Sequence, residues 1–249
     1  MGIFPHQWKI AKVTPLHKSG PKQNIDNYRP ISVMSSPSKI LERYVSSYLL
    51  DHLCRYSLLI ECQYGSRPYH SCETLLLSLI DKWLESMDND NLTGLLLIDF
   101  HKAFDLVNHE ILIKKLACYR VGGNVLQWFS SFLKDRKQRV SIGSSLSHVL
   151  PMLNGVPQGS CLGPLLFLLY VNDIPFGNSS TSTHFHVDDT TLHYSSPSVT
   201  ELNINLQGGV FLGYLKQSGN SRPKIKAHDS WFTTQSWRNW RVPECQNKW

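Results

Sequence analysis

Gly94-Leu95-Leu96-Leu97-Ile98-Asp99-Phe100 is a short apolar run with a single aspartate near its end. Its length and composition are typical of a strand covered on both faces, although a buried helix can share them. The turn residues at 88–91 that precede the run favour the strand. A carboxylate at the end of a buried strand is costly unless a cation or several donors compensate for it. Taken alone, Asp99 is more typical of a helix cap or a surface residue.

Two later stretches give Asp99 more significance. Residues 183–187 and 190–194 alternate in polarity, which predicts a hairpin whose tip is Asp188-Asp189. Residues 155–160, Gly-Val-Pro-Gln-Gly-Ser, predict a glycine-rich turn. Asp-Asp by itself is an ordinary turn dipeptide. Together, however, the strand end and the hairpin tip can bring three carboxylates to one point, and three carboxylates can hold two divalent metals for an in-line phosphoryl displacement.

The remaining pattern mixes helices with a few antiparallel strands. Apolar residues recur at helical spacing after Ser36, a candidate cap, and Pro37 in the first turn. Helices are predicted over 38–53, 76–87, 110–119, 125–133 and 162–171, the last one buried. Strands are predicted at 139–142 and 149–153, and short strands and loops in the first thirty residues. This order lacks βαβ regularity and predicts an α+β fold.

The whole-chain figures limit the classes of function. The chain has 249 residues, 41% of them hydrophobic, enough for one large domain or two closely joined subdomains. Its net charge of +6 favours a polyanionic partner without requiring one. The longest apolar stretch, 162–171, is roughly half of the ~20 residues of a membrane span, so we expect no membrane role. The six cysteines show no C-x-x-C pair or zinc-type spacing, and the N-terminus lacks a signal-peptide pattern. We therefore expect an intracellular protein, nuclear or cytoplasmic and not secreted.

Three sets of residues resemble, in order and spacing, the motifs of one known family. They are Asp99-Phe100-His101-Lys102-Ala103-Phe104-Asp105, the turn at 155–160 with Leu162-Gly163-Pro164-Leu165-Leu166-Phe167, and Val187-Asp188-Asp189. Upstream, Pro15-Leu16-His17-Lys18, Asn27-Tyr28-Arg29-Pro30-Ile31-Ser32 and Gln63-Tyr64-Gly65-Ser66-Arg67 also fit. From about Trp8 to about Leu206 the chain resembles the reverse transcriptases (RNA-directed DNA polymerases) of non-LTR, LINE-type retrotransposons.

The resemblance implies a right-hand polymerase fold, with an antiparallel palm sheet packed on helices. It implies a fingers-like region at 1–92 and a palm at 93–206 with fingers elements interleaved around 108–150. The family normally continues with a thumb, but residues 207–249 do not match one, so we expect a divergent or disordered tail there and a missing thumb. Asp99, Asp188 and Asp189 are implied to be catalytic and to hold two magnesium ions, with manganese as an alternative. Hard oxygen ligands of this kind suit these metals.

The resemblance also implies a set of nucleotide-binding residues. Lys18 and Arg29 grip the triphosphate, Arg with a bidentate fork and Lys with a point charge. Phe104 is the aromatic gate beneath the sugar that favours deoxynucleotides; the alternative is an ordinary core phenylalanine. Gln158 touches the nucleotide and template, beside Gly159, which permits close backbone approach. The alternative for Gln158 is an ordinary turn glutamine.

The reaction implied is attack of a primer 3′-hydroxyl on the α-phosphate of a deoxynucleoside triphosphate. The partners implied are an RNA template, a DNA primer and deoxynucleoside triphosphates, and the catalysis is mainly positioning and electrostatics. Six basic residues either track the nucleic-acid backbone or form a solvated face: Lys114, Lys115, Lys134, Arg136, Lys137 and Arg139. The sequence indicates no membrane partner, and it leaves the oligomeric state unknown.

Two departures from the family pattern concern activity. His186 occupies a position where the family usually has Phe or Tyr, and imidazole is smaller and titrates near neutral pH. Residues 208–249 match none of the family's motifs, which we interpret as a truncated or frame-shifted remnant. Two alternatives therefore stay open. One is a catalytically silent nucleic-acid-binding remnant, and the other is a group II intron-type maturase, which should carry a basic RNA-binding domain after the palm.

Overall fold

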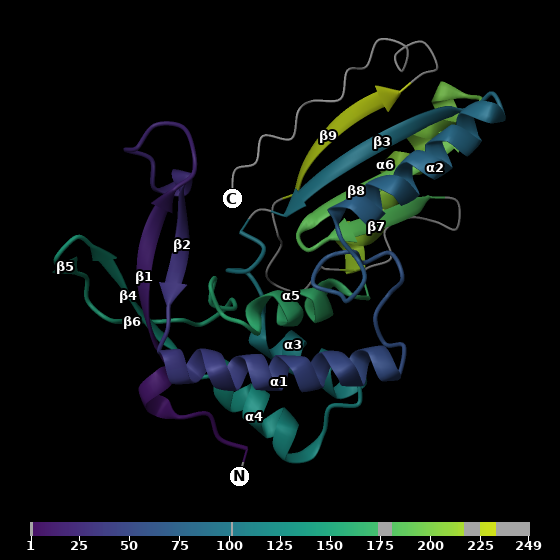
Figure 1. Ribbon diagram of the computed structural model, residues 1–249. Coiled ribbons are helices and arrows are strands. Elements are labelled where there is room, and N and C mark those ends of the chain that lie inside the picture. Colours follow the sequence, from purple (N-terminus) through teal and green to yellow (C-terminus); the bar gives the residue numbers. More distant parts are fainter. Residues whose placement is uncertain (1, 101, 174–180, 217–224, 233–249) are drawn as a thin grey trace.

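Two sheets rise from opposite ends of a layer of helices (Figure 1). The structure is a computed structural model that describes residues 2–100, 102–173, 181–216 and 225–232. The strand order is β2-β1-β4-β5 in the first sheet, with β6 also paired to β4, and β7-β8-β3-β9 in the second. Helices and sheets alternate without βαβ regularity, so the predicted α+β fold is confirmed.

The first sheet is built on an antiparallel hairpin joined by a parallel strand. Its elements are η1 (His6–Trp8), β1 (Ile10–His17), η2 (Ile25–Asn27), β2 (Tyr28–Val33), β4 (Lys137–Ile142), β5 (Ser145–Leu146) and β6 (Leu150–Pro151). β4 runs parallel to β1, so the sheet joins segments more than a hundred residues apart. The predicted return strand at 149–153 is shorter than expected, because β5 and β6 divide the pairing with β4.

The second sheet contains the apolar run from which the fold was predicted. Its strands are β3 (Leu92–Phe100), β7 (Ser182–His186), β8 (Asp189–Ser196) and β9 (Ile225–Phe232). β3 pairs antiparallel with β8 on one side and with β9 on the other. The tail predicted to begin at 207 therefore contributes regular structure: α6 continues to Lys216 and β9 completes the sheet. The other residues of that tail, 217–224 and 233–249, lie outside the described residues.

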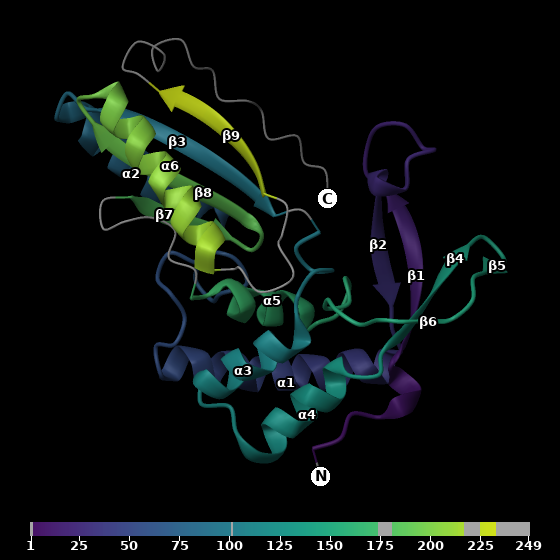
Figure 2. The same cartoon turned by 180° about the vertical axis from the view of Figure 1, so that it is seen from behind.

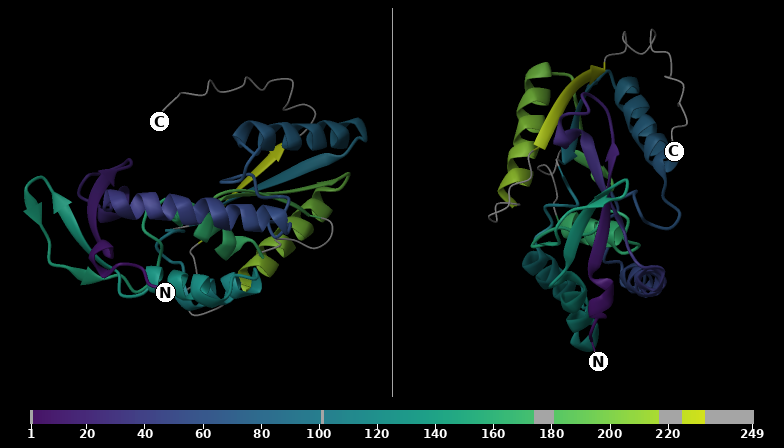
Figure 3. Two further views of the ribbon diagram at one scale, coloured as in Figure 1. Left: turned by 60° about the horizontal axis from the view of Figure 1, so that its bottom comes forward. Right: turned by 90° about the vertical axis from the view of Figure 1, so that its left-hand side faces the viewer.

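The described residues contain six α-helices, five at the predicted places and a sixth, α6, that was not predicted. They are α1 (Ser36–Arg55), α2 (Cys72–Asp88), α3 (His109–Cys118), α4 (Gly123–Leu133), α5 (Gly163–Val171) and α6 (Val199–Lys216). α2 and α6 cover opposite faces of the second sheet, whereas α1, α3, α4 and α5 form the layer at the base of both sheets (Figures 2 and 3). Within the described part of the chain, none of these helices is both long and apolar enough to cross a bilayer.

The helix α1 packs by a different face from the one that its periodicity suggested. The helical spacing placed Ile40, Tyr44, Tyr48, Leu49 and Leu53 among the apolar residues of this helix. Of these, Leu49 and Leu53 are buried, whereas Ile40, Tyr44 and Tyr48 are 73%, 60% and 62% exposed. The apolar residues of α1 occupy two faces, and only one of them meets the core. Periodicity therefore located the helix correctly and its buried side only in part. The cap also differs, because the residue before the helix is Ser35 and not Ser36.

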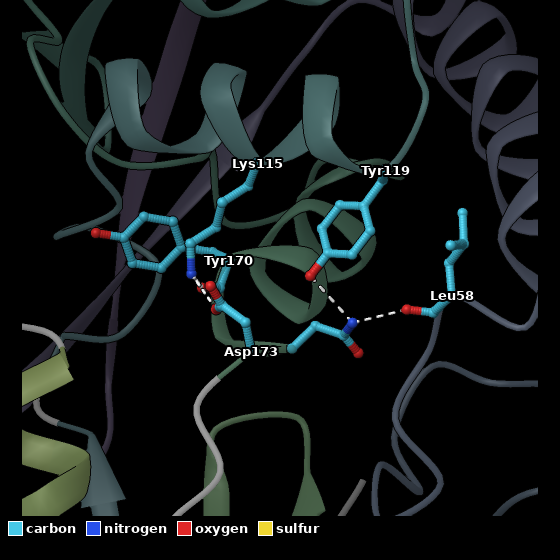
Figure 4. A network of polar contacts seen from close by, with 6 residues as sticks. Leu58, Lys115, Tyr119, Tyr170 and Asp173 are labelled. Carbon is cyan, nitrogen blue, oxygen red and sulfur yellow. Dashed lines mark hydrogen bonds and ion pairs between the residues drawn. The ribbon is translucent and has the colours of Figure 1, made fainter.

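A polar network fixes the carboxyl end of α5 (Figure 4). The Nζ atom of Lys115 donates to the carbonyl of Tyr170 and forms an ion pair with Asp173. A cation at this end of a helix also interacts favourably with the helix dipole. The orientation of α5 is thus tied to α3.

Asn172, in the same network, anchors a distant segment. Its Oδ1 accepts from the amide of Ile60 at 3.0 Å, and its Nδ2 donates to the carbonyl of Leu58 at 2.8 Å and to the hydroxyl of Tyr119 at 3.0 Å. Asn172 is buried, so these bonds satisfy polar groups that water does not reach. These bonds fix the backbone at Leu58 and Ile60, just before residues 62–65.

Candidate active site

Three aspartates come together where β3 meets the β7–β8 hairpin. Asp99 and Asp189 are direct partners in the antiparallel β3–β8 ladder, and Asp188 precedes Asp189 in the turn. Paired residues project from the same face of a sheet, so the Asp99 and Asp189 side chains are neighbours. The predicted hairpin is confirmed, although Asp189 already belongs to β8.

The end of β3 is covered on one face only, which corrects the expectation of a strand buried on both. The covered face consists of Leu96, Ile98 and Phe100, whereas Leu97 and Asp99 are exposed. On the exposed side, α2 covers the start of the strand, where the Thr93 hydroxyl donates to that of Ser86 at 3.1 Å. Asp99 therefore carries no burial cost, and the face that bears it is open to a ligand.

Asp188 is the least exposed of the three carboxylates. Burial raises the pKa of its carboxyl group, and the charges of Asp189 and Asp99 raise this pKa further. A backbone hydrogen bond and the charge of Arg29 lower the pKa of Asp188, but the net shift is upward. Asp189 and Asp99 therefore repel the ionised carboxylate of Asp188, and added positive charge would stabilise that carboxylate.

The donor atoms at this point fit a hard divalent cation, because all of them are carboxylate oxygens. The repulsion of Asp188 by Asp99 and Asp189 is the observation that favours a cation here. Among the described residues, no three His, Cys, Asp or Glu side chains are already gathered as a metal-binding group. The fit therefore rests on the donor set and the register, and not on a preformed ligand cage.

Two exposed cations belong to the β1–β2 hairpin. Lys18 follows β1 directly, and its amide donates to the carbonyl of Asn27 at 2.8 Å. Arg29 lies in β2 opposite Leu16 and is close enough to affect Asp188 electrostatically. Neither side chain forms an ion pair within the described residues. Both predicted triphosphate-binding residues are thus available, and the structure associates Arg29 with the carboxylates.

The turn at 155–160 runs between β2 and the loop after β3. The amides of Gly155 and Val156 donate to the carbonyls of Val107 and Phe104, at 2.7 and 2.8 Å. Gly155 has φ +87°, and a Cβ there would lie 2.7 Å from the carbonyl oxygen of Asp105. Only glycine fits this backbone without strain, as the sequence suggested.

The other end of the same turn docks on β2. The amide of Ser32 donates to the carbonyl of Gln158 at 2.7 Å. Gly159 has φ +105°, and a Cβ there would lie 2.6 Å from the carbonyl oxygen of Ser32. The turn therefore connects the β1–β2 hairpin to the region after β3.

Gln158 and Phe104 lie on adjoining segments near this turn. The Nε2 of Gln158 donates to the Oδ1 of Asp105 at 3.1 Å, so Gln158 has a structural partner. Phe104 is half-buried, with its ring centroid 4.9 Å from that of Phe167. Neither fact decides between the nucleotide-binding roles and the structural alternatives, which stay predictions.

Glu42 supports the turn from α1, and sequence reasoning missed it. This carboxylate is fully buried and accepts from the hydroxyls of Ser38 and Ser160 and from the amide of Cys161. Ser160 Oγ in turn accepts from the amides of Leu162 and Gly163 at the start of α5. In the sequence, Glu42 is an ordinary polar residue in a helical pattern, so no local signal marked it.

Arg136 contradicts the prediction that it tracks a nucleic-acid backbone. It is 1% exposed, and its guanidinium carbon lies 4.7 Å from the ring centroid of Phe132 and 5.7 Å from that of Phe4. Burial lowers its pKa to about 10, against the opposing charge of Glu42. Lys114, Lys134 and Lys137 are exposed, whereas Lys115 is used in the α5 network.

His186 has a partner that the sequence did not indicate. It is opposite Asp189 in the β7–β8 ladder, and its Nε2 lies 3.2 Å from the Sγ of Cys72 at the start of α2. The five described cysteines are all free thiols, and the sixth, Cys245, lies outside the described residues.

Comparisons with known proteins agree with this geometry. A family model described as reverse transcriptase (RNA-dependent DNA polymerase) matches residues 18–219, beyond the limit of Leu206 that the motifs suggested. The chain is 36% identical over 218 residues to the "Probable RNA-directed DNA polymerase from transposon BS" of Drosophila melanogaster, which covers 82% of this chain and 23% of that protein. It is 31% identical over 215 residues to the "RNA-directed DNA polymerase from mobile element jockey" of the same species, covering 83% and 23%.

Solved structures show the same fold at low sequence identity. Telomerase from Candida albicans, in complex with a fragment of telomeric RNA, aligns with a TM-score of 0.62 at 15% identity, covering 92% of this chain and 44% of that one. Apo telomerase from Candida tropicalis, truncated from the C-terminal domain, aligns with a TM-score of 0.60 at 12% identity, covering 93% and 52%. The chain spans only 23% of the length of the two curated relatives named above. It belongs to the reverse transcriptase family and is similar to the polymerases of non-LTR retrotransposons.

Proposed function

We propose that this chain is the catalytic region of an RNA-directed DNA polymerase from a mobile element. The observation that carries the proposal is the direct pairing of Asp99 with Asp189, with Asp188 next to them and Arg29 within electrostatic reach. The reaction is transfer of a deoxynucleotide from its triphosphate to a primer 3′-hydroxyl, with RNA as template. We place the protein inside the cell, in the nucleus or cytoplasm, because that is where its template and nucleotides are.

In this proposal the three aspartates hold two magnesium ions, or manganese in their place. When bound, these ions neutralise the charge that develops on the attacking and leaving oxygens of the in-line displacement. Asp99 and Asp189 contribute from paired strands, which fixes their separation, and Asp188 contributes from the turn. The protein's part is thus to hold the carboxylates on rigid elements before substrate arrives.

The fingers-like hairpin supplies the positive charge for the triphosphate. Lys18 and Arg29 flank the β1–β2 turn and form no ion pair within the described residues, so their donors are free for phosphate oxygens. Phe104 would stand beneath the sugar, and Gln158 beside the nucleotide and template, with Gly159 allowing close approach. We also propose the division into a fingers-like region at 1–92, a palm at 93–206 and a tail from 207.

Primer extension tests this function directly. The purified 249-residue chain, given an RNA template, a DNA primer, magnesium and deoxynucleotides, is expected to extend the primer, and Asp188→Asn is expected to lower the rate at least about 100-fold. Template binding, measured by fluorescence anisotropy, should be unchanged in the variant. If the unmodified chain gives no more product than Asp188→Asn while both bind template, the polymerase function is wrong and a silent binding remnant is the better description.

A further inference from the structure

The segment 62–65 lies along the edge of β7, beside the hairpin that carries Asp188. The amide of Phe185 donates to the carbonyl of Cys62 at 2.8 Å, and the amide of Tyr64 donates to the carbonyl of Phe185 at 2.8 Å. Gln63 and Phe185 form the parallel bridge between the two segments. β7 is the last strand on its side of the sheet, so these bonds cover its remaining edge. A segment more than a hundred residues away in the sequence is thus built into the catalytic hairpin.

Gln63 connects this segment to the turn itself. Its side chain is 1% exposed, and its Oε1 accepts from the amide of Gly65 at 2.8 Å and from the amide of Val187 at 3.4 Å. The Nε2 of the same side chain has no hydrogen-bond partner within the described residues. Within the described residues, this buried side chain therefore forms hydrogen bonds only through its oxygen, and one of the two donors is the amide of Val187, the residue that precedes Asp188.

Val187 holds an unusual backbone conformation. Its φ is +59°, a left-handed value that is strained for a β-branched residue. Such a conformation persists only where the surroundings impose it. Because Asp188 is the next residue, the backbone angles of Val187 set the direction in which the Asp188 carboxylate leaves the turn.

Gly65 packs against Val187 on the same side as the Gln63 oxygen. A Cβ at Gly65 would lie 2.5 Å from the amide nitrogen of Val187 and 2.6 Å from its Cγ2. The first of these is a backbone atom, so a larger residue at 65 must displace the turn. The base of the segment is fixed as well, because Asn172 binds the backbone at Leu58 and Ile60.

We propose that Gln63 and Gly65 are positioning residues that impose the left-handed conformation of Val187 and thereby set the place of Asp188 relative to Asp99 and Asp189. The inference rests on the proposed function, since it requires Asp188 to act in catalysis. Its consequence is specific. Loss of either residue lowers the catalytic rate and the affinity for metal, whereas nucleotide and template are still bound by groups on other elements.

Gly65→Ala is the first test, with Gly122→Ala as its matched control. Gly122 precedes α4 with φ −131°, and a Cβ there meets no atom within 4 Å. We expect Gly65→Ala to lower kcat about 10- to 100-fold, as a small misplacement of a catalytic group does, with KM for the nucleotide changed less than about twofold. Gly122→Ala should match the unmodified chain in both constants.

Gln63→Met is the second test, and it can still support or contradict the inference if Gly65→Ala does not fold. Methionine has a similar shape and removes the oxygen that accepts from Gly65 and Val187. Gln127→Met, on the exposed surface of α4, is the matched control. Binding of Mn²⁺, followed by the electron paramagnetic resonance signal of the free ion, should weaken at least about threefold in Gln63→Met and not in Gln127→Met. Circular dichroism confirms that each variant tested is folded.

The outcomes separate this inference from the proposed function. If Asp188→Asn abolishes extension and weakens Mn²⁺ binding, but folded Gln63→Met and Gly65→Ala behave as the unmodified chain, then these two residues do not position Asp188. A fall in kcat accompanied by an equal rise in KM, with Mn²⁺ binding intact, would also overturn the inference, since it would indicate general loosening of the site. If Asp188→Asn itself has no effect, the proposed function fails first.

Discussion

At the scale of single residues, the molecule buries several ionisable groups away from the proposed catalysis. His184 and His193 lie under α2, with their Nε2 atoms 3.2 Å apart and their rings stacked. Burial, with a smaller contribution from the charge of Lys82, lowers the pKa of His184 to about 4; burial, with smaller contributions from His184 and Lys82, lowers the pKa of His193 to about 3. Both rings are therefore neutral near pH 7, and the Nε2 atom of one ring donates a hydrogen bond to the Nε2 atom of the other.

This pair predicts an acid-sensitive fold. Both pKa values lie below the unfolded value of about 6.5, so the unfolded chain binds protons more readily and stability falls as pH drops below that value. Between pH 7.5 and pH 5 we expect each ring to account for a loss of about 2 kcal/mol in the free energy of unfolding, and the pair for about 4 kcal/mol. Urea unfolding at the two pH values measures it. In the double variant His184→Leu, His193→Leu the difference should shrink, and an unchanged difference would assign the acid sensitivity to other groups.

At the scale of elements, β9 is a strand that the sequence analysis did not predict. It pairs with β3 along the register from Thr93↔Phe232 to Phe100↔Ile225, and so protects the edge of the strand that carries Asp99. An uncovered edge of this length is a template for association with other chains. The tail therefore takes part in the fold of the second sheet, although its residues match none of the motifs.

Removing β9 tests that role. A chain ending at Lys216 is expected to lose about 2–4 kcal/mol of stability, because several ladder hydrogen bonds of about 0.5–1.5 kcal/mol each disappear. It should also self-associate in size-exclusion chromatography with light scattering. A chain ending at residue 232 keeps β9 and is the control. Equal stability and equal mass for the two truncated chains would show that β9 contributes nothing.

The elements differ in how far the sequence predicted them. The β3 strand and the β7–β8 hairpin were predicted because period and turn residues are local signals. The exposure of Tyr44 and Tyr48 on α1 was not, since two apolar faces compete and tertiary packing chooses between them. The contact of Gln63 with Val187 joins residues 124 apart in the sequence, so no pattern within either segment contains it.

At the scale of the whole molecule, net charge indicated the class of partner that the proposed function requires, but it did not identify the residues that would contact this partner. The value of +6 agrees with membership in a family of nucleic-acid polymerases. Arg136 is nevertheless buried between aromatic rings, although it stands among Lys134 and Lys137 in a basic run. A count of charges along the chain cannot distinguish a cation that faces solvent from one that packs in the core.

Salt dependence distinguishes these two kinds of cation. The affinity for single-stranded RNA should fall as salt rises, and the double variant Lys134→Ala, Lys137→Ala should reduce the slope of log affinity against log salt by about 1.4, or about 0.7 per lost phosphate contact. Arg136→Met should leave the slope unchanged and lower the melting temperature. Fluorescence anisotropy over a salt series measures the slope. A slope that responds to Arg136→Met and not to the lysines would reverse this assignment.

The pairing of Asp99 with Asp189 also determines which short deletions in the gene for this chain would preserve the three-aspartate site of the protein. Loss of one codon between Asp189 and Leu192 in β8 would put these two residues in the wrong phase, because side chains alternate with a period of two, so keeping Leu192 in the core would turn Asp189 away from the face that bears Asp99. Loss of one codon in the exposed loop 19–24 would shorten a turn and leave the β3–β8 ladder intact. Inherited copies should therefore tolerate small deletions in that loop and lose the paired carboxylates through the same deletions in β8.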